Sequence, residues 1–289
     1  MPGVLLRLAP GIFVLLWSGG YTAIRLALDH AEPLTLQALR YGIVVAGLLP
    51  LWALLRPGLP PARVVWHLLR MGLLVQFAYF AACNLAQAHG MTPAGLALCL
   101  ALQPIIVAIL APWLTGEAVG AHSWAGLLCA LAGCGAVILS GSALGPQGWL
   151  GLVFGLLALG TLTGGALLER RGGAPVHPVV SNLVLYTVGL LATLPLAAAT
   201  ETMRVDWSAG LVWPLLYLVV ANSLVATTLL LMMIRAGGAA RASALLFLVP
   251  PLAAAMAWVV LGQSMAPLAW AGTGLAALGV SLARRKPAG

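Results

Sequence analysis

The side chains in this sequence that could bind or transform a small molecule lie inside very apolar stretches, and most are aromatic or neutral polar. Trp17 and Tyr21 are four residues apart, and Gln76 and Tyr79 are three apart, so each pair shares one helical face. Such a face offers ring surface and hydrogen bonds to a solute, while helix packing with an internally satisfied polar group is the alternative. The candidate solute-binding residues are Trp17, Tyr21, Arg40, Gln76, Tyr79, Asn84, Gln103, Thr163, Asn222 and Thr227.

Arg40 is the charged member of this set. It lies seven residues after Pro33, which places it about 10 Å into a helix that begins there. A charge at that depth in a membrane is costly and needs a partner. One interpretation is a counter-charge for an anionic group of the solute. The other is snorkelling to the membrane surface, or pairing with Asp29 or Glu32.

The acidic residues argue against two kinds of chemistry, because all six lie at the ends of apolar segments or between them: Asp29, Glu32, Glu117, Glu169, Glu201 and Asp206. A proton antiporter for cationic drugs usually needs a carboxylate within the membrane, so facilitated passage of a neutral or zwitterionic solute is favoured. An intramembrane enzyme would need paired carboxylates, a Ser/His pair or a metal cluster at depth, and the sequence offers none. We therefore expect no catalytic residue, no metal and no cofactor.

The composition indicates which elements must position these residues. Of 289 residues, 62% are hydrophobic and 7% are charged, with a mean hydropathy of +1.05. Soluble domains contain about 25% charged residues, so the solvent of this chain must be lipid. The net charge of +8 comes from short basic clusters between apolar runs, with no basic face, so nucleic acid is not an expected partner. The distribution of these clusters predicts that both termini are cytoplasmic.

The apolar runs predict an all-α polytopic membrane protein with ten transmembrane helices, because a span needs about 20 apolar residues. Short connections that carry Pro, Gly or charge separate the runs. The predicted helices are 10–28, 33–55, 64–88, 92–114, 121–139, 147–169, 178–199, 210–234, 239–261 and 266–283.

The second half of the chain repeats the first, since corresponding residues such as Pro104 and Pro250 are 146 positions apart. We expect an N-terminal five-helix repeat at 1–144 and a C-terminal one at 145–289. An odd number of helices per half makes the second repeat inverted relative to the first. Prolines and glycines inside the helices are predicted to act as hinges for a rocking motion, and these are Pro104, Pro250, Gly164 and Gly165.

Several segments resemble the drug/metabolite transporter superfamily and, within it, the ten-helix EamA-type permeases. They are WSGGYTAIRLAL at 17–28, PLTLQALRYGIVVAGLLP at 33–50, and the repeated stretch LALQPIIVAIL…GEAVGAHSWAGLLCALAG. The resemblance implies an inner-membrane carrier that works by alternating access. It also implies that the solute path runs between the two halves, with the predicted helices 121–139 and 266–283 at the back.

These observations predict a bacterial inner-membrane transporter that exports amino acids or similar small metabolites by alternating access, without covalent chemistry. A proton-coupled drug or metabolite efflux carrier is the alternative within this class, and an intramembrane enzyme is the disfavoured alternative from another class. The expected partners are a small-molecule solute and the lipid bilayer. The solute, the net direction, any coupling ion and the oligomeric state stay open, a monomer being one possibility.

Overall fold

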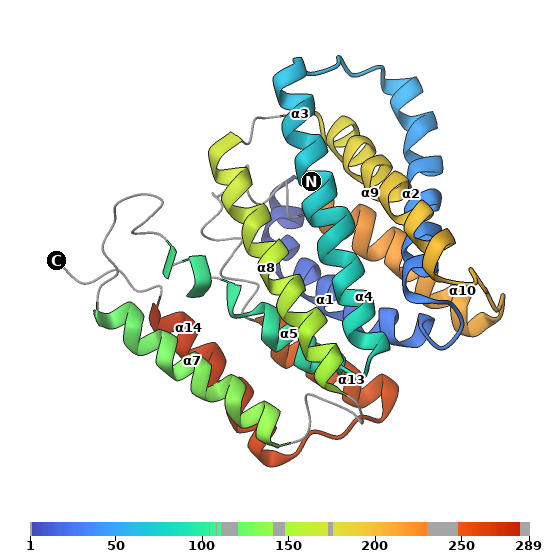
Figure 1. Ribbon diagram of the computed structural model, residues 1–289. Helices are drawn as coiled ribbons and strands as arrows, with labels where there is room; N and C mark the ends of the chain where they lie inside the picture. Colours follow the sequence, from blue (N-terminus) through green and yellow to red (C-terminus); the bar gives the residue numbers. More distant parts are fainter. Residues whose placement is uncertain are drawn as a thin grey trace.

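The computed structural model describes residues 2–103, 105–107, 109–110, 121–140, 148–172, 176–229 and 248–283, and its regular elements there are helices (Figure 1). Two of these elements, η1 and η2, are π-helical. The elements are α1 (Pro2–Ala27), α2 (Pro33–Leu55), α3 (Ala62–Met71), η1 (Gly72–Tyr79), α4 (Phe80–Ala88), α5 (Pro93–Leu100), α7 (Ala121–Leu139), α8 (Gly148–Gly172), α9 (Pro178–Thr200), α10 (Ala209–Leu216), η2 (Tyr217–Ala226), α13 (Val249–Leu261) and α14 (Pro267–Ala283).

Prolines mark where several of these helices begin. Pro33, Pro93, Pro178 and Pro267 are each the first residue of a helix, a position whose N–H has no intrahelical partner and whose loss therefore costs little. At the other end, α13 stops at Gly262, whose φ of 65° is the left-handed conformation that glycine adopts without strain. The sequence thus sets these helix boundaries locally.

The chain is a multi-pass membrane protein. Five helical stretches in the described part are long and apolar enough to cross a bilayer: Pro33–Leu55, Ala62–Ala88, Gly148–Glu169, Pro178–Thr200 and Ala209–Leu229. Large apolar side chains stand on the outer surface of the bundle, among them Leu54, Trp213 and Val259. An apolar surface of this extent would be unstable in water and suits contact with lipid tails.

The described helices overlap each of the ten predicted spans, and their boundaries correct three of the predictions. The first helix begins at Pro2, not at residue 10. The helix predicted at 64–88 begins at Ala62 and contains a π-helical stretch. The helix described after Thr92 ends at Leu100, where a turn precedes a further helical piece. The total of ten spans and the cytoplasmic location of the termini stay predictions.

The π-helical stretches occupy matching places in the two halves of the chain. η1 and η2 start at Gly72 and Tyr217, which are 145 positions apart. A side chain satisfies a backbone carbonyl in each, because the Tyr41 hydroxyl donates to Gln76 O and the Tyr186 hydroxyl donates to Ser223 O. π-Helical turns widen a helix locally and are frequent at functional sites.

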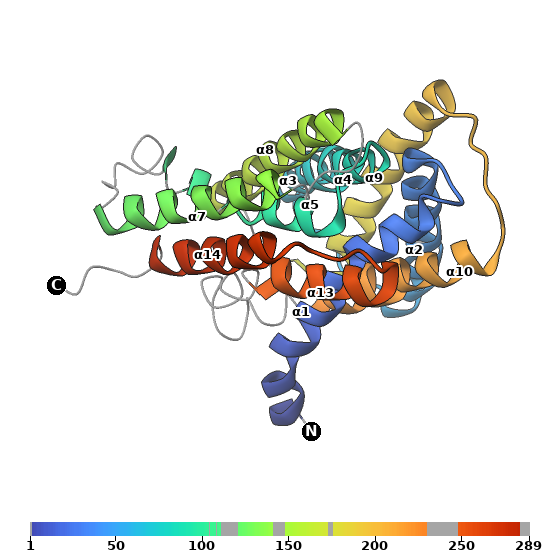
Figure 2. The same cartoon turned by 90° about the horizontal axis from the view of Figure 1, so that it is seen from below.

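Packing between the elements is reciprocal (Figures 1 and 2). α1 contacts η2 and α13, while α8 contacts η1 and α5; α2 packs on α9, and α7 packs on α14. Glycines let the last pair approach closely, since a Cβ on Gly272 would lie 2.6 Å from Gly133 O and one on Gly279 would lie 2.6 Å from Gly126 O. Small residues at such contacts strengthen dispersion between membrane helices. The α7–α14 pair lies at one edge of the bundle.

Candidate functional site

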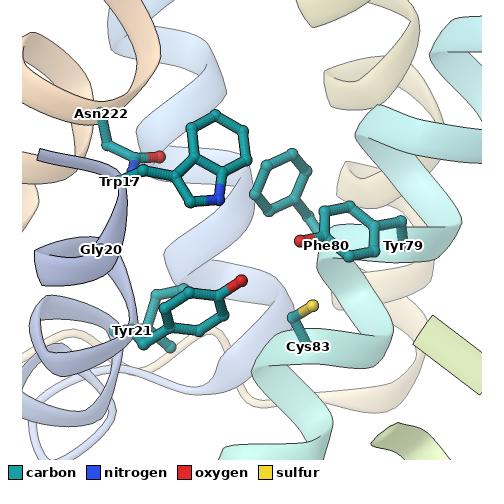
Figure 3. A pocket seen from close by; sticks show the side chains of 8 residues that line it. Trp17, Gly20, Tyr21, Tyr79, Phe80, Cys83 and Asn222 are labelled. Carbon is teal, nitrogen blue, oxygen red and sulfur yellow. The ribbon is translucent and has the colours of Figure 1, made fainter. Parts of the chain in front are cut away.

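A small cavity opens between helices from both halves of the chain (Figure 3). α1 provides one wall, the junction of η1 and α4 provides the second, and η2 provides the third. It is lined by Trp17, Gly20, Tyr21, Ile24, Tyr79, Phe80, Cys83 and Asn222. The cavity offers about 20 Å³ to the centre of a water-sized sphere, which is room for about one water molecule. In this conformation the cavity is therefore too small to hold an amino acid.

Two glycines bring α1 and η2 close enough to form the cavity. A Cβ on Gly20 would lie 2.5 Å from Asn222 Nδ2, and one on Gly19 would overlap the Tyr217 hydroxyl. That hydroxyl donates a 2.9 Å hydrogen bond to Leu16 O. A larger residue at either position would displace the Tyr217 or Asn222 side chain and with it the hydrogen bonds that these side chains make.

Aromatic rings with polar atoms form most of the cavity wall. Figure 3 shows the Trp17 indole nitrogen, the Tyr21 hydroxyl and the Cys83 sulfur directed toward a common space. Tyr79 is almost fully buried, and its ring packs on that of Phe80 with centroids 4.7 Å apart. Rings of this kind bind apolar groups by surface contact and cations by their faces. Three predicted binding residues, Trp17, Tyr21 and Tyr79, are thus brought together here.

Arg40 lies directly behind this wall and is buried, with 4% of its surface exposed. Its Nε donates a 2.8 Å hydrogen bond to Ser223 Oγ, and its Nη2 donates a 2.7 Å bond to Asn222 Oδ1. The guanidinium carbon also stands 4.9 Å from the centroid of the Phe80 ring. Because Asn222 and Phe80 line the cavity and also hold Arg40, the charge is one side chain away from it.

The alternative considered for Arg40, snorkelling or pairing with a nearby acid, is wrong. Asp29 bonds Arg25 at 2.7 Å, and the Glu32 carboxylate bonds residues that follow α9. Among the described residues, no carboxylate lies within 4.0 Å of Arg40. Among the described residues, neutral groups and ring faces hold this buried positive charge, and no counter-ion lies beside it.

Two predicted residues on the helix of η1 and α4 support the fold near the cavity but do not line it. Gln76 gives its backbone carbonyl to the hydroxyl of Tyr41 and to Gln37 Nε2 at 3.0 Å. Asn84 Nδ2 donates a 3.0 Å hydrogen bond to Pro33 O at the start of α2, and its Oδ1 is buried without a hydrogen-bond partner among the described residues. Both residues thus connect α2 to its neighbouring helix, Gln76 through its backbone carbonyl and Asn84 through its side chain.

Three more predicted residues bond to helix backbones outside the cavity wall. Gln103 Nε2 donates to Leu162 O at 3.3 Å, and so connects the chain after α5 to α8. The Thr163 and Thr227 hydroxyls each bond a carbonyl of their own helix. Asn222, in contrast, both lines the cavity and holds Arg40. Five of the ten predicted binding residues thus belong to this site. Trp17, Tyr21, Tyr79 and Asn222 line the cavity, and Arg40 is bound to Asn222 directly behind its wall.

The predicted hinges lie in varied settings. Pro104 is outside the described residues. Pro250 is in the first turn of α13, where a proline breaks no hydrogen bond of that helix. Gly164 and Gly165 of α8 pack on η1, because a Cβ on Gly165 would lie 2.5 Å from a methyl of Val75. Their contact with η1 matches that of the Gly19–Gly20 doublet with η2.

Sequence reasoning missed several residues of the site. Gly20, Ile24, Phe80 and Cys83 line the cavity, and Ser223 holds the guanidinium of Arg40. The signal for three of them was present, since Gly20 and Ile24 follow residue 17 and residue 21 by three, and Cys83 follows residue 79 by four. Positions three or four apart share a helical face. Nothing in the sequence indicated the partner of Arg40.

The part of the chain that the structure describes holds no cluster of side chains that could bind a metal ion. No group of three or more His, Cys, Asp or Glu side chains gathers there. The acids that can be placed lie in the connections at 29–32 and 201–206, or near the end of α8, where Glu169 bonds His67 at 2.9 Å. Glu117 lies outside the described residues.

Comparisons with known proteins agree with this architecture. A family model described as the EamA-like transporter family matches residues 1–140 and again residues 149–285. A solved structure titled "Crystal structure of protein" is similar at 20% identity with a TM-score of 0.68, over 96% of this chain and 97% of that one, so the two share a fold. No curated protein matches the sequence. The chain thus belongs to the EamA-like transporter family and is a membrane transporter of the drug/metabolite type.

Proposed function

We propose that this transporter exports amino acids or similarly small metabolites across the bacterial inner membrane by alternating access, as a facilitated carrier. In this proposal the two halves, 1–144 and 145–289, are inverted repeats with both termini in the cytoplasm. The solute binds between them, in an enlarged form of the cavity lined by Trp17, Tyr21 and Tyr79. In this proposal the protein carries out no covalent chemistry.

The observation that carries this proposal is the buried guanidinium of Arg40, which has no carboxylate partner in the part of the chain that the structure describes. Its Nη1 bonds no acceptor among the described residues, so donors remain for a further group. A carboxylate on the solute would supply the missing anion, with charge-assisted hydrogen bonds. The ammonium group of an amino acid could meet the faces of the neighbouring rings. A zwitterionic amino acid satisfies both features.

Reciprocal packing supports alternating access. Each half presents its first helix to the π-helical stretch of the other half, through Gly19–Gly20 on one side and Gly164–Gly165 on the other. Two such equivalent contacts allow one half to rock against the other while a central site stays between them. Pro104, Pro250, Gly164 and Gly165 are the proposed bending points of this motion.

The placement of the acids supports facilitated transport. A carboxylate in the cavity could bind a proton and a solute in turn and so couple their movements. The described acids lie instead in connections or near a helix end, and the cavity wall offers amide, hydroxyl, thiol and indole groups. The solute gradient would then drive the transport.

Uptake of a labelled amino-acid panel into proteoliposomes, with and without an imposed proton gradient, tests this function. We expect saturable uptake of at least one amino acid, at a rate that the gradient does not change. Uptake that depends on the gradient would retain the carrier and overturn facilitated transport. If no member of the panel enters above the rate of protein-free vesicles, the proposed solute class is wrong.

A further inference from the structure

Two connections that are far apart in the sequence are joined at one end of the bundle. The first links α1 to α2, and the second follows α9. Glu201 of the second accepts hydrogen bonds from Leu34 N at 2.8 Å and from Thr35 N at 2.7 Å. The Thr35 hydroxyl adds a third bond of 2.7 Å. A carboxylate from one half thus caps the first turn of α2 in the other half, where free N–H groups and the helix dipole favour an anion.

Glu32 returns the same kind of contact in the opposite direction. It occupies the N-cap position of α2 without capping that helix. Its carboxylate instead accepts bonds from Thr202 N at 3.2 Å, from the Thr202 hydroxyl at 3.0 Å and from Arg204 N at 3.1 Å. Between these donors, Met203 has a φ of 54°, a left-handed conformation that is uncommon for a residue other than glycine. The connection therefore bends so that it surrounds the carboxylate.

Further contacts beside these two carboxylates also join the connection before α2 to the one after α9. Ala31 and Val205 form an isolated antiparallel β-bridge, and Asp206 N donates a 2.8 Å hydrogen bond to His30 O. His30 Nδ1 also lies 2.9 Å from Asp206 Oδ2. We call the set Glu32, Glu201, the 31–205 bridge and the 30–206 pair the loop clamp.

At the opposite end of the bundle, the described residues of the two halves are joined less extensively. There the described side chains make one hydrogen bond between the halves, from α3 to α8, between His67 and Glu169 at 2.9 Å. The connection at 56–61 between α2 and α3 is largely exposed. Among the described residues, the polar contacts between the two halves are thus concentrated at the end that holds the loop clamp.

We propose that the loop clamp is the gate that closes the solute path at the face predicted to be outside the cell. The two carboxylates form a latch, because each belongs to one half and binds backbone N–H groups of the other. Opening this face breaks both carboxylate contacts and the β-bridge, and closing it forms them again. The gate goes beyond the proposed function by naming the residues that separate during one step of the cycle, and it rests on alternating access.

A disulfide across the β-bridge tests this gate directly. The variant Ala31→Cys/Val205→Cys places two thiols at a directly paired position, where side chains are close enough to be joined. After oxidation in proteoliposomes, we expect uptake to fall to the rate of protein-free vesicles and to return on reduction. Each single variant, oxidised in the same way, is the control and retains uptake. Full uptake by a variant shown by mass spectrometry to be cross-linked would overturn the proposal.

A second measurement needs no transported solute, so a failure of the gate is distinguishable from a failure of the proposed function. Cys83 lines the cavity and is buried. Its alkylation by a membrane-impermeant maleimide, located by mass spectrometry, reports how often the cavity opens. We expect Glu32→Gln/Glu201→Gln to raise the rate at least several-fold. The matched control is Asp29→Asn, which removes a carboxylate of the same connection whose partner among the described residues is Arg25 of its own half, and it should leave the rate unchanged. Equal rates in the two variants would refute the latch.

Discussion

Replacing Arg40 by Gln is the sharpest test of how the cavity selects its solute. The guanidinium uses Nε and Nη2 on Ser223 and Asn222, at 2.8 and 2.7 Å, and a solute carboxylate would take donors that remain. A hydrogen bond to a charged group contributes about 1.5–3 kcal/mol. Since about 1.4 kcal/mol corresponds to a factor of ten, Arg40→Gln should raise the solute concentration that gives half-maximal uptake by about 10- to 100-fold.

The assay compares one amino acid with its amide, which has the same side chain and ammonium group but no carboxylate. In proteoliposomes, Arg40→Gln should weaken uptake of the acid by this factor and change the amide far less. Arg40→Lys, which keeps the charge and loses the two-pronged geometry, should fall between them. The thermal unfolding midpoint of each variant checks that the fold survives. If Arg40→Gln lowers uptake of the amino acid and of its amide by the same factor, a counter-charge role for Arg40 is refuted.

Three other predictions follow from the same contacts. Gly133→Ala should destabilise the protein by about 1–3 kcal/mol, because its Cβ would press on the backbone of α14, whereas Gly135→Ala on the same helix meets open space and should not destabilise it, as unfolding in detergent would show. Tyr79→Ala should lower uptake with the fold retained, and Asn84→Ala, which removes a bond outside the cavity, should lower the unfolding midpoint more than uptake. Desolvation opposes the ionised form of Glu32, but the N–H groups of Arg204 and Thr202 outweigh it and hold the pKa of this carboxyl below its ordinary value. The stabilisation from the Glu32 carboxylate is therefore complete above about pH 4.3 and is lost as the pH falls through the lowered pKa. The difference in unfolding midpoint between the wild type and Glu32→Gln should thus shrink in acid. A difference that stays constant down to pH 3 would contradict this.

The amino-acid sequence by itself determined the class of molecule and most helix positions. An apolar fraction of 62% with 7% charge leaves lipid as the only suitable solvent, and prolines such as Pro33 and Pro178 fix helix starts through local sterics. The same-face rule correctly paired Trp17 with Tyr21, since that spacing depends on one helix alone. The match of the family model to two separate stretches agrees with the resemblance that the repeated segments indicated.

The tertiary structure alone decided which polar residues meet. Tyr79 and Asn84 looked equivalent in the sequence, yet one lines the cavity and the other binds the start of α2. Arg40 had two near acids along the chain, but its partners come from η2, more than 180 residues away. Spacing along a helix tells which residues share a face and says nothing about the neighbouring helix that this face meets. Which helices meet depends on close packing between the two halves. The glycine doublets permit this packing, and hydrogen bonds between the halves, such as that from Tyr217 to Leu16 O, add to it.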